Sequence, residues 1–85
     1  MNVSRHQQRV LHALAQGGCI RHYFDSSKKI IGVDCVTREG WVLENCTLNL
    51  FRTLKSKGLI ASKNGRPYRI SRKGLLAVRA RPDNR

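Results

Sequence analysis

The sequence is poor in acidic side chains, with five Asp and Glu against seventeen Lys and Arg and a formal net charge of +12. So few carboxylates leave little material for general acid–base catalysis, and no closely spaced acidic pair occurs. The motifs GxSxG, GxxxxGK[ST] and HExxH, which carry nucleophilic, phosphate-binding and zinc chemistry, are also absent from the sequence. We therefore expect a binding protein rather than an enzyme.

Long apolar runs are missing as well. No stretch reaches the ~18–20 consecutive apolar residues that cross a bilayer, and residues 1–5 lack the apolar segment of a signal peptide. We therefore expect a cytoplasmic protein without a membrane partner.

Cysteine is scarce, and its spacing excludes the usual covalent and metal frameworks. Cys19, Cys35 and Cys46 are odd in number and form no CxxC motif. Each has apolar neighbours, which favours small buried side chains. The three histidines add no recognisable ligand spacing, so we expect neither a metal nor a cofactor.

What is present suits one small globular domain. Hydrophobic residues make up 40% of the 85 residues, enough for one core but not for two. Residues 1–85 are therefore predicted to be a single domain.

The first predicted element is a helix over residues 5–16. Ser4 and Gln7 have the spacing of a capping box, and Gly17-Gly18 supplies the expected stop. Alternating side chains and a polar turn then predict a hairpin over residues 19–36.

The segment that follows this hairpin is ambiguous. Residues 37–40 are typical of a turn, whereas residues 41–45 fit either a short helix or the end of a strand. Trp41 lies within this segment, and we expect it to anchor the core, as a single tryptophan most often does.

A second helix is predicted over residues 47–57, with Thr47 as its cap and Gly58 as its stop. Residues 59–70 then read as a hairpin, because Asn64-Gly65 favours a type I′ turn. A final short helix over 72–79 should bury its apolar side chains, Leu75, Leu76 and Val78.

Together these elements predict an α+β fold, namely a winged-helix-like single domain with an additional N-terminal β-hairpin. In winged-helix domains the helix before the wing reads the major groove, and here that helix would be residues 47–57. The hairpin over 59–70 would be the wing. The extra hairpin puts standard groove docking in doubt and offers a sheet edge that could pair with a second copy, giving a homodimer.

Positive charge is concentrated in the second half of the chain. Residues 1–46 hold six Lys or Arg and four Asp or Glu, whereas residues 47–85 hold eleven and one. Such a field attracts polyanions. We expect the C-terminal half to meet DNA or an acidic protein through Asn49, Arg52, Thr53, Lys55, Ser56, Lys63, Asn64, Arg66, Arg69, Arg72 and Lys73.

Several stretches resemble the YjhX-type family of small bacterial proteins, nearly from end to end. The most distinctive are Arg-Glu-Gly at 38–40, Asn-Cys-Thr-Leu at 45–48, Asn-Gly-Arg-Pro-Tyr-Arg-Ile at 64–70 and the ending at 77–85. The resemblance implies a toxin of a toxin–antitoxin pair that inhibits bacterial DNA topoisomerase I, by binding the enzyme or its double-stranded DNA. It also implies an antitoxin partner.

Two alternatives remain open on the sequence. One is a winged-helix transcriptional regulator that binds DNA. The other is an RNA- or ribosome-associated basic protein, which the charge favours but the lack of exposed aromatic stacking pairs weakens.

Overall fold

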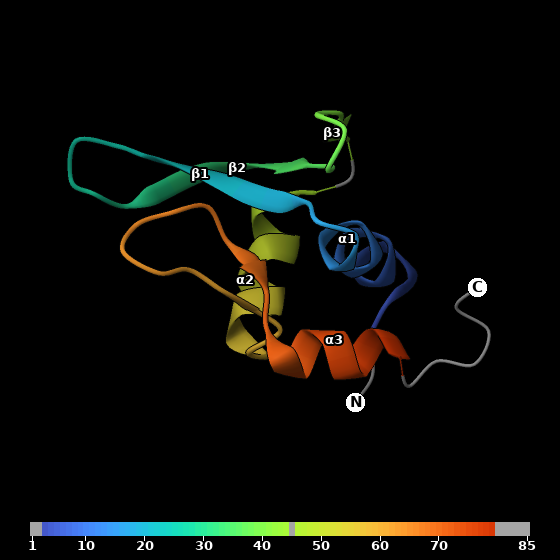
Figure 1. The fold of residues 1–85 in the computed structure, drawn as a ribbon. Helices are drawn as coiled ribbons and strands as arrows, with labels where there is room; N and C mark the ends of the chain where they lie inside the picture. Colours follow the sequence, from blue (N-terminus) through green and yellow to red (C-terminus); the bar gives the residue numbers. More distant parts are fainter. Residues whose placement is uncertain (1–2, 45, 80–85) are drawn as a thin grey trace.

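The computed structural model describes residues 3–44 and 46–79, which form a small α+β domain (Figure 1). Its elements are, in order, α1 (Arg5–Ala15), β1 (Cys19–Phe24), β2 (Ile30–Val36), β3 (Val42–Leu43), α2 (Leu48–Ser56), β4 (Ile60–Ala61), β5 (Arg69–Ile70) and α3 (Arg72–Arg79). The three predicted helices and both predicted hairpins are present, within about a residue or two of the expected bounds.

The helix ends follow the capping chemistry of the sequence. Ser4 and Gln7 form the predicted capping box, each side chain accepting a backbone N–H of the other at 3.2 Å. The Thr47 hydroxyl accepts a backbone N–H of α2 at 3.1 Å. Gly17 (φ +108°) and Gly58 (φ +73°) close the two helices in the left-handed conformation.

The larger sheet is antiparallel, in the order β1-β2-β3, and all three helices lie on one side of it (Figure 1). On the covered face Ile20 and Cys35 are fully buried opposite one another. On the other face Tyr23 and Val42 are 46% and 57% exposed. The sheet is therefore packed on one side only.

The second hairpin is short, because its strands pair only as Ile60↔Ile70 and Ala61↔Arg69. Asn64 (φ 55°) and Gly65 (φ 75°) take the two positive φ angles that a type I′ turn needs, which confirms the predicted turn. Directly before β5, Tyr68 pairs with Ile20 of β1 through two 2.8 Å backbone hydrogen bonds. These bonds join the second hairpin to the free edge of the larger sheet.

One hydrophobic core fills the space between the sheets and helices. Helix α3 contributes only the partly buried Ala77 and Val78. The buried members of the core are Val3, Val10, Leu11, Leu14, Ile20, Cys35, Cys46, Phe51, Leu54, Leu59 and Ile60. The prediction of buried cysteines is confirmed for Cys35 and Cys46, whereas Cys19 is only half-buried.

The prediction that Trp41 anchors the core is wrong, because its side chain is 73% exposed. Residues 37–40 form a turn. The Thr37 N–H donates to the Trp41 carbonyl and the Trp41 N–H donates to the Thr37 hydroxyl, which places Trp41 directly before the short strand β3. The ambiguous segment thus contains a strand, and the tryptophan ring lies outside the packed face. Asn45, in the same segment, lies outside the described residues.

The prediction for α3 is also wrong in one side chain, since Leu76 is 59% exposed. The helix packs through Gly74, Ala77 and Val78, which share one face at helical spacing. A methyl group at Gly74 would overlap the carbonyl oxygen of Leu59, so the helix approaches too closely for larger side chains. Leu76 falls outside this narrow contact face.

Between α1 and α2 the described residues form strands and turns, with no further helix. A helix-turn-helix pair needs a second helix directly before the recognition helix. The fold is therefore described as α+β with two antiparallel sheets, and its winged-helix character stays a prediction.

Candidate functional site

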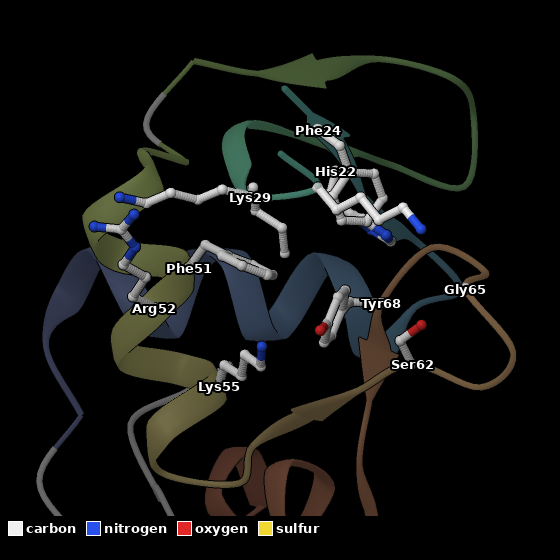
Figure 2. A pocket seen from close by; sticks show the side chains of 11 residues that line it. His22, Phe24, Lys29, Phe51, Arg52, Lys55, Ser62, Gly65 and Tyr68 are labelled. Atoms are coloured by element: carbon white, nitrogen blue, oxygen red, sulfur yellow. The ribbon is translucent and has the colours of Figure 1, made fainter. Parts of the chain in front are cut away.

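A groove of about 600 Å³ opens between three segments that are distant in sequence (Figure 2). The tip of the β1–β2 hairpin forms one wall, α2 forms another, and residues 62–68 between β4 and β5 form the third. Figure 1 shows that the two hairpin ends project to the same side of the molecule. The Ile20–Tyr68 pairing holds them in this arrangement.

Four cationic side chains line the groove. Lys28 and Lys29 come from the tip of the first hairpin, and Arg52 and Lys55 come from successive turns of α2. All four are exposed, and none of the described residues that line the groove is acidic. The groove therefore has the charge of an anion-binding site.

The turn at the hairpin tip fixes where its two lysines lie. The carboxylate of Asp25 accepts the backbone N–H of Lys29 at 3.0 Å and the backbone N–H of Ser27 at 2.9 Å. These hydrogen bonds lower the pKa of Asp25, and the one from Lys29 has the largest effect. Lys28 has φ +65°, a left-handed conformation that lysine adopts rarely.

Aromatic rings form the inner side of the groove. Phe24 and His22 meet edge to face at 5.0 Å, His22 and Tyr68 at 5.2 Å, and Tyr68 and Phe51 at 4.9 Å between ring centroids. Lys55 Nζ lies 5.7 Å from the centre of the Tyr68 ring, within cation–π range. This chain of rings runs from the exposed Phe24 to the buried Phe51 (Figure 2).

The residues predicted as contacts fall into three groups. Arg52 and Lys55 line the groove. Lys63, Arg66 and Arg69 line a separate hollow of about 400 Å³ at the second hairpin. The others line neither hollow: Asn49, Thr53, Ser56, Asn64, Arg72 and Lys73. All of these are exposed except Thr53, which is half-buried and whose hydroxyl donates to the Asn49 carbonyl within α2.

Sequence reasoning missed the first hairpin's share of the groove. Lys28 and Lys29 were interpreted only as turn residues, and His22 and Phe24 only as alternating strand positions. The available signal was two adjacent lysines in a turn that follows two aromatic side chains on one strand face. Recognising it required knowing that this turn lies beside α2.

The thiols of Cys35 and Cys46 form a hydrogen-bonded pair. This hydrogen bond, together with burial, raises the pKa of Cys35, whereas the same hydrogen bond lowers the pKa of Cys46. Among the described residues, no group of three or more His, Cys, Asp or Glu side chains could hold a metal ion. No helix in the described part of the chain is long and apolar enough to cross a membrane.

By its fold and site the molecule is a small, basic α+β protein with a cationic groove backed by aromatic rings. Over residues 1–85 it matches the family described as "Putative toxin of bacterial toxin-antitoxin pair". The chain belongs to this family, the YjhX toxins. The description implies an antitoxin as a partner.

Relatives of similar length occur in several bacteria. The chain is 61% identical to a UPF0386 protein of Rhodospirillum centenum, covering 100% of this chain and 99% of that protein. It is 59% identical to a UPF0386 protein of Parvibaculum lavamentivorans and 49% identical to one of Aliivibrio fischeri, with full coverage of both chains in each case. No solved structure matches the chain.

Proposed function

We propose that this protein is a non-enzymatic toxin that inhibits bacterial DNA topoisomerase I by occupying the enzyme's DNA. The observation that carries the proposal is the groove, where Lys28 and Lys29 lie across from Arg52 and Lys55 with no acidic lining residue among those described. The target enzyme is what the YjhX resemblance implies. The choice of DNA over the enzyme surface is supported by the groove's charge.

Binding alone would account for inhibition. Phosphate groups seated against the groove's cations would release condensed counterions, which is the main source of sequence-independent affinity for nucleic acid. A DNA segment covered in this way is closed to the enzyme. The lack of closely spaced acids in the sequence favours a mechanism without turnover.

A relaxation assay with purified topoisomerase I and supercoiled plasmid tests this proposal. Inhibition should follow the ratio of protein to plasmid DNA, and should not change when the enzyme concentration is varied at constant DNA. The quadruple variant K28Q/K29Q/R52Q/K55Q should no longer inhibit, while K63Q/R66Q/R69Q should still do so. Inhibition that instead saturates at one protein per enzyme would identify the enzyme as the target and contradict DNA occupancy.

The second candidate is a winged-helix DNA-binding regulator. It is favoured by the order of α2 and a hairpin with a type I′ turn, and by the exposed side chains of Asn49, Arg52 and Ser56 on α2. A regulator should prefer one duplex sequence over others by at least several kcal/mol, about 4–10 for established specific binders. Binding that shows no sequence preference excludes it.

A further inference from the structure

We propose that the ligand of the groove is single-stranded DNA, with phosphates along the four cations and a base against the ring of Phe24. This inference rests on the proposed function and specifies the form of DNA that the groove takes. Three features of the groove lead to it: an exposed, pre-positioned ring, two further walls that face α2 across the groove, and the groove's volume.

The first feature is Phe24, whose side chain is 54% exposed although it lies on the helix-facing side of the sheet and lines the groove. Its ring meets His22 edge to face at 5.0 Å. His22 Nδ1 is buried and has no hydrogen-bond partner among the described residues, so ring contacts with Phe24 and Tyr68 hold this imidazole. An aromatic ring fixed in this way can stack on a base at little entropic cost.

The second feature is that α2 is one of three walls of the groove. To read duplex DNA, a helix must enter a major groove about 12 Å wide and project beyond its neighbours. Here the hairpin tip with Lys29 and the loop with Ser62 and Gly65 border the same groove as Arg52 and Lys55 (Figure 2). A single strand can lie between these walls, whereas a duplex meets them first.

The third feature is size. At about 600 Å³, the groove is within the roughly 300–1,000 Å³ range of sites for small organic ligands. That volume suits one or two unpaired bases, with phosphates of the neighbouring nucleotides on the exposed cations at its rim. In a duplex the bases are paired and stacked on each other, so they are not available to Phe24.

Fluorescence anisotropy with the full-length protein tests the inference. The probes are a labelled oligodeoxythymidine of about 12 nucleotides, within the ~4–16 nucleotide range of single-strand sites, and a blunt duplex of the same length. We expect the single strand to bind at least tenfold more tightly. A plot of the logarithm of its affinity against the logarithm of salt concentration should fall with a slope of about 3, because each of the four phosphate contacts contributes roughly 0.7.

Two aromatic substitutions supply the matched comparison. Phe24→Leu should weaken binding of the single strand on the order of tenfold, since a lost stacked base is usually worth about that much or more. Trp41→Leu removes another exposed ring, one that does not line the groove, and should leave affinity unchanged. Phe24→Trp should retain or increase affinity, and melting curves of all variants check the fold.

The outcomes separate this inference from the proposed function. Equal or tighter binding of the duplex, or equal effects of Phe24→Leu and Trp41→Leu, overturns the single-strand inference while leaving DNA occupancy intact, provided that K28Q/K29Q weakens duplex binding. If neither DNA form binds, the proposed function fails as well. A tenfold preference for oligouridine over oligodeoxythymidine overturns the assignment to DNA and supports an RNA-associated role.

Discussion

The two hairpins of the molecule place similar charges in different surroundings. The first pairs at six positions from Cys19↔Val36 to Phe24↔Ile30, with a register shift between Tyr23 and Phe24, so its tip extends over α2. The second pairs at only two positions, and its cations Lys63 and Arg66 line a hollow of their own. The length of the ladder, rather than the number of cations at the turn, decides which hairpin contributes charge to the groove.

The turns differ as well. In the second hairpin the left-handed positions are held by Asn64 and Gly65, the residues that adopt this conformation most easily. In the first hairpin the left-handed position is held by Lys28, for which the same conformation costs about 1–2 kcal/mol. A strained lysine that lines a groove is consistent with a binding role, since strain tends to collect at functional sites.

The largest expected difference is in DNA affinity. K28Q/K29Q removes two groove contacts. Each contact contributes roughly 0.7 log units of affinity for every decade of salt below about 1 M, so single-strand binding should weaken about 60-fold at 0.05 M salt. K63Q/R66Q removes the same charge from the other hairpin and should cost less than about threefold, since distant charges are screened. Anisotropy titrations of the two variants make the comparison, and equal losses would contradict it.

The next effect concerns the base of the second hairpin. Gly74→Ala places a methyl group against the backbone of Leu59 and the side chain of Ile70, and should lower the free energy of unfolding by about 1–3 kcal/mol. Leu76→Ala, in the same helix but exposed, should change it by less than about 0.5 kcal/mol. Urea denaturation measures both. A stable Gly74→Ala variant would show that α3 does not hold the hairpin this closely.

A smaller effect separates the two turns. Gly65→Ala forces alanine into a left-handed conformation and should destabilise the fold by about 1 kcal/mol. Lys28→Gly removes the strain of the same conformation but adds the backbone entropy that glycine loses on folding. The net result should be a fold more stable by roughly 0.5 kcal/mol and weaker DNA binding. Thermal melts together with anisotropy test both changes. A destabilised Lys28→Gly variant would refute the strain assigned to this turn.

The smallest effect is a pH dependence at the first tip. Because the pKa of Asp25 is lowered in the fold, its stabilising contribution is complete above its unfolded pKa of about 3.9 and disappears as pH falls through the folded value. Asp25→Asn should flatten the stability profile in that acidic range. Melting temperatures between about pH 2 and pH 6 provide the check, and an unchanged profile would count against the turn geometry.

Much of this fold follows from local chemistry that the sequence displays. The Ser4–Gln7 capping box, the glycine stops and the Asn64-Gly65 turn depend on neighbouring residues only, and the structure confirms each of them. The predictions that Trp41 and Leu76 are buried were wrong, because residue type alone does not reveal which face of a short element is covered.

The site was harder to predict because it is assembled from distant segments. The sequence drew attention to the basic C-terminal half, and Arg52 and Lys55 of α2 do line the groove. The other two cations, Lys28 and Lys29, come from the half with little net charge. Their proximity to α2 depends on the long pairing of β1 and β2 and on the Ile20–Tyr68 bridge, and neither is encoded in any local pattern.

The central claim is that DNA binds in the groove between the first hairpin and α2. The most direct measurement is a titration of the labelled protein with oligodeoxythymidine, followed by amide chemical shifts in two-dimensional NMR. The largest shifts should occur at Phe24, Lys28, Lys29, Arg52 and Lys55, with small changes at Lys63, Arg66 and Arg69. Shifts centred on the second hairpin and α3, with the groove residues unchanged, would contradict the claim.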